Sequence, residues 1–276
     1  MRRTAVFFTV LLCAGALSCK SLVLENRTEC PAMLFIDLED ETNLEGNAAV
    51  RIAVRDVNTS RILAADTPHL EDLDPERYSL EIHKAPLIFV SGVTGVIRSQ
   101  EDGSPKTLTI PCGMEGDPIY LFTSTVPAMD DQLLVPAKLR KEYSRLTLRF
   151  SLEDGVFPYH VTMAGNTSGI DMISGKPVCG PFRCEPEELS PGVFSCIVPR
   201  QSDNLLSLEI MLKEGLTDKE DFSGTLFLSN YLSRIPDFSW TMENLPDITL
   251  DIDFFHLSIT VTVNDWNVAQ TVNLTI

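Results

Sequence analysis

Residues 247–276 read DITLDIDFFHLSITVTVNDWNVAQTVNLTI, and this stretch decides the fold class. Its apolar residues alternate with polar ones in three runs: at even positions over 248–254, at odd positions over 257–263, and at even positions again over 266–276. Alternation with a period of two is typical of a β-strand that has one buried face. A one-residue slip turns every side chain over, so each change of phase requires a bulge or a turn.

The two changes of phase have different interpretations. Phe254-Phe255 is poor turn chemistry, so we predict a bulge or a change of sheet there. Asn264-Asp265 is suited to a two-residue β-hairpin. The last strand is then predicted to run as far as Ile276.

The same alternation recurs upstream, and it predicts an all-β protein. No long stretch has the 3.6-residue period of a helix, although short helical turns are expected near residues 217–222 and 228–234. An all-β chain of 276 residues most naturally forms two β-sandwich domains. We place these domains at residues 19–136 and 137–276, with residues 127–136 as the linker. The alternating segments outside the C-terminal stretch are 50–54, 78–82, 146–152 and 206–212.

The first nineteen residues predict export and a lipid anchor. A basic start, Met1-Arg2-Arg3, precedes an apolar stretch that is too short for a comfortable membrane span, which needs about 20 residues. Small residues before Cys19 resemble a bacterial lipoprotein cleavage site. We therefore predict a signal peptide over residues 1–18 and lipid attachment at Cys19. Ala16 stands where the usual motif has Leu, and an ordinary secretory signal with a chance cysteine is the alternative.

The charge balance excludes two classes of partner. The chain has 22 Lys+Arg and 39 Asp+Glu, a formal net charge of −17. A nucleic-acid partner would require a basic stripe, and electrostatic docking on an anionic membrane would require cationic residues. Acyl chains on Cys19 would hold the protein at a membrane without charge attraction, because each buried CH2 contributes about 0.8 kcal/mol.

The cysteines are consistent with export and leave their pairing open. Beyond Cys19 the sequence has Cys30, Cys112, Cys179, Cys184 and Cys196. An odd number leaves at least one thiol without an intrachain partner. Cys179, Cys184 and Cys196 are close in sequence, and we expect two of these three to pair. The C-x4-C spacing has no nearby His, so we predict no metal and no cofactor.

No catalytic constellation is visible in the sequence. It has no G-x-S-x-G, H-E-x-x-H, G-x-G-x-x-G or P-loop motif, so we predict no catalytic residue and no small-molecule substrate. Asp247, Asp251 and Asp253 could provide a carboxylate pair for glycoside hydrolysis, but their alternation predicts a solvated sheet face. Trp240 and Trp266 are either sugar-stacking platforms or packed residues, and packing is the simpler interpretation.

Several short segments carry a resemblance to one known family. They are Asn26-Arg27-Thr28-Glu29-Cys30-Pro31 with the strand 33–38, then Val198-Pro199-Arg200-Gln201-Ser202-Asp203, then Asp237-Phe238-Ser239-Trp240 with 244–253, and finally Asp265-Trp266. In this order they resemble segments of the FimB-type family of fimbrial anchor lipoproteins from Bacteroidales. Ala32 stands where the family has a second Cys and Asn26 where it has Asp, and residues 91–110 match nothing in the family.

The resemblance implies two transthyretin-like β-sandwich domains, lipidation in the outer membrane and a position at the base of a fimbria. Its partners would be the major fimbrial subunits. It also implies assembly by strand exchange, in which a C-terminal strand fills a groove on a neighbouring subunit. The strand could instead complete its own sandwich, and a surface glycan-binding β-sandwich lipoprotein is the alternative function. The candidate donor strand comprises Trp266, Val268, Val272, Leu274 and Ile276.

Overall fold

The structure is a computed structural model, and it describes residues 30–39, 44, 48–95, 100–101, 107–151, 157–213, 224–235, 238–253, 258–264 and 269–275. Regular structure in these ranges is nearly all strand. The exceptions are a four-residue helix, α2 (Ser229–Leu232), and a three-residue 3-10 turn, η2 (Leu70–Asp72). The all-β prediction is therefore confirmed. The predicted signal peptide and Cys19 lie outside the described residues, so both stay predictions.

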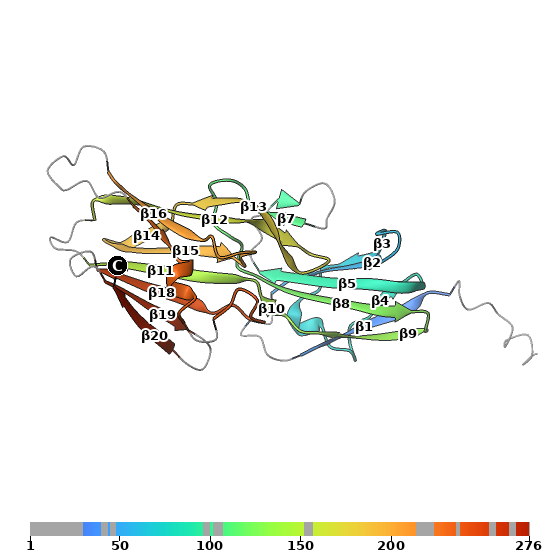
Figure 1. Cartoon of the computed structure of the whole chain (residues 1–276). Helices are drawn as coiled ribbons and strands as arrows, with labels where there is room; N and C mark the ends of the chain where they lie inside the picture. Colours follow the sequence, from blue (N-terminus) through green and yellow to red (C-terminus); the bar gives the residue numbers. More distant parts are fainter. Residues whose placement is uncertain are drawn as a thin grey trace, which may run out of the picture.

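The N-terminal sandwich packs a three-stranded sheet against a five-stranded sheet (Figure 1). The first sheet has the order β4-β1-β9, and the second has the order β10-β8-β5-β2-β3. Leu34 and Ile36 of the first sheet are buried in one core with Ile52 and Phe122 of the second. The strands are β1 (Ala32–Leu38), β2 (Val50–Asp56), β3 (Ile62–Asp66), β4 (Leu80–Ile82), β5 (Ala85–Gly95), β8 (Ile119–Ala128), β9 (Gln132–Ala137) and β10 (Arg140–Lys141).

The C-terminal sandwich is built from two six-stranded sheets. One has the order β14-β15-β11-β18-β19-β20; the other has the order β17-β16-β12-β7-β6, with β13 paired to β12. Leu148 and Leu250 of the first sheet share a core with Met163 and Leu208 of the second. The strands are β6 (Gln100–Glu101), β7 (Thr107–Thr109), β11 (Tyr143–Phe150), β12 (Tyr159–Asp171), β13 (Lys176–Cys184), β14 (Glu187–Ser190), β15 (Val193–Pro199), β16 (Ser207–Leu212), β17 (Gly224–Phe227), β18 (Asp247–Asp253), β19 (Ser258–Asn264) and β20 (Ala269–Thr275).

The two sandwiches share one pairing scheme. In each sandwich, one sheet has its first strand in sequence paired in parallel with a strand much later in the chain. In the N-terminal sandwich β1 pairs with β9, and in the C-terminal sandwich β11 pairs with β18. The remaining strand pairs in the described part of the chain are antiparallel. The N-terminal sheet ends at β9, whereas the C-terminal sheet continues beyond β18 with β19 and β20. The β19–β20 hairpin is therefore an addition to the shared scheme.

The chain passes between the sandwiches more than once. After β5 of the N-terminal sheet, β6 and β7 pair into the C-terminal sheet beside β12, and β8 then returns to pair with β5. Residues 127–136, which the sequence indicated as a linker, instead form the end of β8 and most of β9. The linker interpretation is wrong because β9 pairs with β1 along its length, with Pro136 opposite Asp37. The boundary at residue 136 itself stays a prediction.

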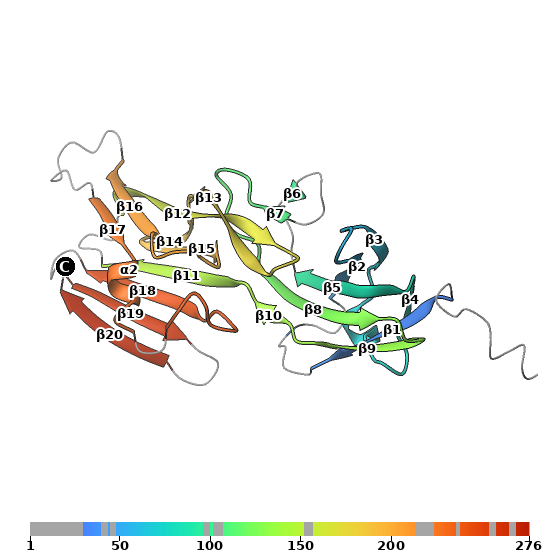
Figure 2. The ribbon, with the colours of Figure 1, turned by 45° about the vertical axis from the view of Figure 1, so that its right-hand side comes forward.

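The molecule is elongated and has two lobes (Figures 1 and 2). An apolar cluster of side chains joins them. It unites residues of the N-terminal sheet with residues of β7 and the β12–β13 hairpin. Figures 1 and 2 show β1 at one end of the molecule and β19–β20 at the other. The cluster fixes the lobes end to end rather than face to face. Its members are Val93, Leu108, Ile119, Leu121, Ile170 and Met172.

The C-terminal stretch differs in detail from its sequence-based interpretation. β18 and β19 pair antiparallel in one sheet with Asp253 opposite Ser258, so the chain reverses between them rather than passing a bulge or changing sheet. The predicted reversal after Asn264 is confirmed, but Asn264 pairs with Ala269, so the connection is longer than two residues. Longer hairpin loops accept more residue types than two-residue turns do. The poor turn chemistry of Phe254-Phe255 therefore did not exclude a hairpin. The helical turn expected near 228–234 is confirmed as α2.

Candidate functional site

The candidate donor strand forms the outer edge of a sheet. β20 pairs with β19 over its whole length, with Val272 opposite Val261 and Leu274 opposite Ile259. β20 is terminal in the described sheet order, so no described strand lies along its second edge. Such an edge presents backbone N–H and C=O groups to which another chain can bind. Three members of the candidate, Trp266, Val268 and Ile276, lie outside the described residues.

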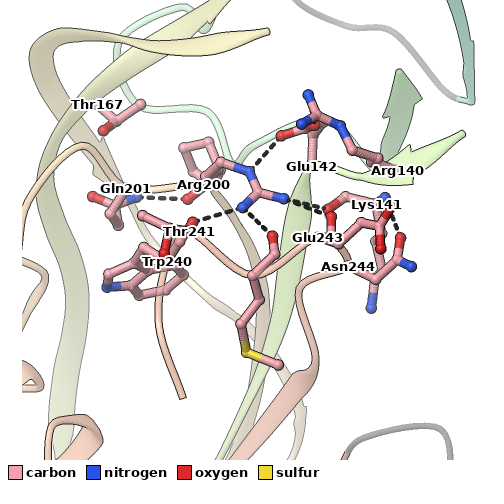
Figure 3. Close-up of polar contacts among 12 residues, drawn as sticks. Arg140, Lys141, Glu142, Thr167, Arg200, Gln201, Trp240, Thr241, Glu243 and Asn244 are labelled. Carbon is pink, nitrogen blue, oxygen red and sulfur yellow. Dashed lines mark hydrogen bonds and ion pairs between the residues drawn. The ribbon is translucent and has the colours of Figure 1, made fainter. Parts of the chain in front are cut away.

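A buried polar junction lies where the chain passes from one sandwich to the other (Figure 3). Glu142 is the single residue between β10, which pairs in the N-terminal sheet, and β11, which pairs in the C-terminal sheet. Arg200 follows β15 directly, and its backbone N–H donates to the Glu142 carbonyl at 3.0 Å. We call Lys141, Glu142, Arg200 and segment 240–247 the Arg200 junction.

Every guanidinium nitrogen of Arg200 has acceptors in this junction (Figure 3). Nε forms an ion pair with Glu142 Oε2. The two terminal nitrogens donate to backbone carbonyls, those of Lys141, Trp240, Met242 and Glu243, at 2.6–3.1 Å. A guanidinium has five N–H donors in one rigid plane, so lysine could not reproduce this arrangement. The Arg200 side chain is 9% exposed and that of Glu142 is 1% exposed, so water does not weaken these bonds.

Lys141 attaches the same segment to β10 and β11. Its backbone N–H donates to Asn244 Oδ1 at 2.9 Å, and its Nζ donates to Asp247 Oδ1 at 2.7 Å. The same Asp247 oxygen accepts the Arg145 backbone N–H at 2.8 Å. The Lys141 ammonium also lies 4.6 Å from the ring centroid of Tyr143, which is a cation–π contact. Asp247 therefore has a structural role beyond the solvated sheet face that its sequence pattern predicted.

The Glu142 carboxylate is the buried anion of the junction. Burial raises the pKa of Glu142 above the ordinary glutamate value, and the guanidinium groups of Arg200 and Arg140 act in the opposite direction. Arg140 Nη2 lies 3.2 Å from Glu142 Oε1, so both carboxylate oxygens face a cation. The two arginines compensate a charge that would otherwise be costly to bury.

A half-open pocket of about 400 Å³ lies beside the junction. Residues 201–204 after β15, the end of α2 and residues 238–241 line it. The rings of Phe238 and Trp240 meet edge to face, 5.2 Å apart between centroids. Trp240 is only 6% exposed, so its ring packs in the core, as the simpler sequence interpretation predicted. Trp266, its counterpart in the prediction, lies outside the described residues.

The structure distinguishes among the three candidate cysteines without showing a bond between them. Cys184 and Cys196 are buried in one apolar core, whereas Cys179 is exposed. All three are thiols in the structure, and so are the exposed Cys30 and Cys112.

The described part of the chain has neither a membrane-spanning helix nor a cluster of metal ligands. No helix there is long and apolar enough to cross a membrane. In the same ranges, no group of three or more His, Cys, Asp or Glu side chains is placed to hold a metal ion.

The Arg200 junction could not be predicted from the sequence, although both of its segments carry the family resemblance. The segment at 198–203 contributes Arg200, and the segment at 237–253 contributes three of the four carbonyls. The one available signal was an arginine directly after an apolar strand, at Arg200. Its acceptors are backbone carbonyls, which have no signature in the sequence.

Comparisons with known proteins identify the fold. No protein-family profile matches the chain, and no curated protein sequence matches it. Solved structures do match over most of its length. A provisionally assigned polysaccharide-binding protein from Bacteroides thetaiotaomicron has a TM-score of 0.62 at 13% identity, covering 88% of this chain and 98% of its own. A provisionally assigned adhesin from Bacteroides ovatus has a TM-score of 0.56 at 11% identity, covering 88% and 95%.

A third similar structure is the fimbrial anchor protein Mfa2 from Porphyromonas gingivalis. Its TM-score is 0.56 at 12% identity, and the match covers 86% of this chain and 98% of that one. At identities this low the likeness establishes a shared fold and nothing finer. The shared fold extends over both sandwiches, because nearly nine-tenths of the chain is covered in each comparison.

Proposed function

We propose that this chain is the lipid-anchored base subunit of a fimbria, tethered to the outer membrane at Cys19 and joined to the neighbouring subunit by its C-terminal strand. The observation that carries the proposal is the β19–β20 hairpin. It extends a sheet beyond the scheme that both sandwiches share, and it lies at the end of the molecule opposite β1 (Figure 1). The N-terminal sandwich forms without such a hairpin, so β20 can be exchanged without removing a strand that both sandwiches have.

Two independent lines support a role in fimbriae. The segments around Cys30, Arg200 and Trp240 resemble the FimB-type family in sequence. The fold over 86% of the chain is similar to that of Mfa2, a fimbrial anchor protein. The sequence segments and the overall fold are separate observations, so their agreement is more informative than either alone.

Strand donation has a defined physical basis. A strand that adds to the open edge of another subunit gains ladder hydrogen bonds along its backbone, and alternate side chains set the specificity. β20 has apolar residues at alternate positions, Val272 and Leu274, within the predicted donor run. Donation from this end leaves the N-terminal end free for the membrane.

An anchor must also transmit a pull from the fimbria to the membrane. The two ends of the molecule belong to different sandwiches, so the load has to cross between them (Figures 1 and 2). The Arg200 junction lies at this crossing, beside the passage from β10 to β11. Removing one partner of a buried ion pair costs about 3–5 kcal/mol, so the junction resists separation of the lobes.

The test is a deletion of residues 266–276 in the full-length protein. We expect the truncated chain to stay folded and lipid-anchored while the cells shed their fimbriae into the medium. Circular dichroism and thermal unfolding of the purified protein check the fold, and the ratio of cell-bound to shed fimbriae measures attachment. Fimbriae that remain firmly attached, or a truncated chain that unfolds, would contradict strand donation.

The lipid anchor needs a separate variant. Cys19→Ser keeps the signal sequence but removes the thiol to which lipid would be joined. We expect this variant to leave the membrane fraction and to lose metabolic labelling with a fatty acid. Retention in the membrane with unchanged labelling would disprove the anchor while leaving the role of the C-terminal strand open to the deletion test.

A second candidate function, glycan binding at the cell surface, is favoured by the pocket beside the junction. Phe238 supplies a partly buried ring and Asp203 and Ser239 supply polar groups, which together suit a sugar. Calorimetric titration with surface oligosaccharides tests this function. Binding that Phe238→Ala abolishes without loss of folding would support it, and absence of heat with every oligosaccharide would reject it.

A further inference from the structure

The length of β13 decides which cysteines can meet. Cys184 is buried at the end of this strand, whereas Cys179 is exposed five residues earlier. Five residues of strand span roughly 16 Å, and a disulfide requires Cα atoms within about 7 Å of each other. Cys179 and Cys184 therefore cannot pair with each other. This removes the C-x4-C pair from the three combinations that the sequence allows.

Cys184 and Cys196 meet in the core from opposite sheets. Cys184 ends β13, which pairs with β12, and Cys196 lies in β15 of the facing sheet. They are 1% and 2% exposed and belong to the same apolar cluster. The Cys184 thiol is close enough to Cys196 to raise the pKa of the Cys196 thiol. Cys179, exposed on the outer side of β13, does not share this position.

One short loop holds the backbones of both strands at this point. The Gly113 N–H donates to the Arg183 carbonyl at 3.1 Å, and the Gly116 N–H donates to the Ile197 carbonyl at 2.7 Å. The Ile197 N–H in turn donates to Glu115 Oε2 at 3.0 Å. Residues 113 and 116 are at most about 10 Å apart along an extended chain. The loop therefore ties together the two neighbours of the buried cysteines, independently of where their side chains lie.

We propose that Cys184 and Cys196 form a disulfide that links the two sheets of the C-terminal sandwich in the exported protein. The inference rests on the export that the proposed function includes, because disulfides persist in oxidising compartments. It does not depend on lipid attachment or on strand donation. It also assigns Cys179 as a free thiol.

The chemistry requires a thiol oxidase, a protein whose own disulfide accepts the electrons. The thiolate of one cysteine attacks that disulfide and forms a mixed disulfide, releasing one oxidase thiolate. The second cysteine, also as thiolate, then attacks the sulfur of the first and releases the other oxidase thiolate. The new S–S bond thus costs the chain two protons and two electrons, and the oxidase disulfide is reduced to a dithiol.

The surroundings of the pair indicate when this reaction takes place. Contact with Cys184 and burial both raise the pKa of the Cys196 thiol well above its ordinary value. Only the thiolate is nucleophilic, so the closed core is a poor place for the attack. Oxidation is therefore expected during folding, before the core closes, and a reduced folded chain should oxidise slowly.

The decisive measurement uses the unaltered exported protein, recovered without reductant from the cell envelope or from the medium. Free thiols are alkylated in denaturant, and the chain is cut with trypsin and then after glutamate. Both cysteines lie between Arg183 and Arg200 with glutamates between them, so the second cut yields two peptides joined only by a disulfide. We expect linked, unalkylated Cys184 and Cys196 peptides beside an alkylated Cys179 peptide. Alkylated Cys184 and Cys196 in exported protein would overturn the inference.

Localisation separates the two proposals. A chain that fractionates with the cytoplasm refutes the proposed function through its export step. A chain that is exported with both thiols free refutes the disulfide alone. An exported, oxidised chain that does not attach fimbriae supports the disulfide and refutes the function.

Stability provides a second readout with matched variants. Reducing the wild type with dithiothreitol should lower its Tm by roughly 5–10 °C, as expected for a disulfide that closes a short loop. Cys184→Ser and Cys196→Ser should each remove most of this sensitivity to dithiothreitol, and Cys179→Ser should leave it unchanged. A wild-type Tm that is unaffected by reductant would contradict the link, and the peptide measurement stands if a variant fails to fold.

Discussion

The two sandwiches are built on one scheme and close differently. In the N-terminal sandwich the sheet ends with β9, the strand that runs parallel to β1. In the C-terminal sandwich the equivalent parallel strand is β18, and the sheet continues with β19 and β20. The N-terminal sandwich therefore shows that the fold can close without such a hairpin. A strand that the fold does not require is the one most available for binding a neighbour.

The largest expected difference in stability is between a charge placed in β9, which closes the N-terminal sheet, and a charge placed in β20, which is added to the C-terminal sheet. Val135 of β9 is 0% exposed, so Val135→Asp should cost more than about 5 kcal/mol and unfold the N-terminal sandwich. Val272→Asp in β20 should change stability by less than about 1 kcal/mol while abolishing attachment of fimbriae. Urea unfolding and the ratio of bound to shed fimbriae measure these outcomes. Equal destabilisation would mean that β20 closes its sandwich as β9 does.

A smaller effect is expected from uncoupling the two lobes at their polar junction. Arg200→Met leaves Glu142 buried without its main partner, so the free energy of unfolding should fall by about 3–5 kcal/mol. Calorimetry should then resolve two transitions where the wild type has one. Arg183→Met is the matched control, because its ion pair with Glu209 is half exposed and should contribute at most about 1 kcal/mol. If Arg183→Met lowers the free energy of unfolding as much as Arg200→Met does, the junction does not contribute more to stability than an exposed ion pair.

The apolar cluster between the lobes should contribute less than the ion pair. Met172, in the β12–β13 hairpin, is 8% exposed and packs with Leu121 of the other lobe's sheet. Met172→Ala should lower stability by about 2–3 kcal/mol through lost burial. Met211→Ala, at a position 56% exposed, should have an effect within about 0.5 kcal/mol. Equal melting temperatures for the two variants would argue against a tight contact between the lobes.

The smallest expected effect is the pH dependence contributed by Glu142. Because burial raises its pKa, the folded chain binds more protons than the unfolded chain between the ordinary glutamate pKa and the raised one. Stability from this group is therefore fully present below the ordinary value and decreases as the pH rises through the raised value. Unfolding free energies of the wild type and Glu142→Gln from pH 4 upward, about the ordinary glutamate pKa, measure it. A difference that runs in the opposite direction would mean that Arg200 outweighs burial.

Strands were the part of the structure that local sequence predicted well. The alternation at 146–152 and 206–212 corresponds to β11 and β16, with shifts of only a few residues at the ends. Burial on one face of a strand requires an apolar side chain at every second position, so a short stretch of sequence is enough to predict the strand. The connections were predicted less well, because a loop of several residues accepts many sequences. Phe254-Phe255 is the clear example.

Pairing between distant segments could not be predicted. β6 and β7 lie between two strands of the N-terminal sheet in sequence, yet they pair beside β12 of the other lobe. Neither their composition nor their spacing indicates that partner. Because residues 100–101 and 107–109 add to a sheet assembled from strands much later in the chain, their place is decided only when that sheet forms.

The sequence by itself determined the all-β class, the buried face of strands such as β11 and β16 and the absence of recognisable catalytic motifs, because each of these is a property of side chains in local order. Only the tertiary structure decided the Arg200 junction and which of the candidate cysteines are buried. The acceptors around Arg200 are backbone carbonyls, which every residue has, brought together from positions 40–59 residues away. Cys184 and Cys196 are both buried, but only the packing of two sheets makes them neighbours. The alternation of side chains predicts which face of a strand is buried, but it does not predict which residues pack against that face.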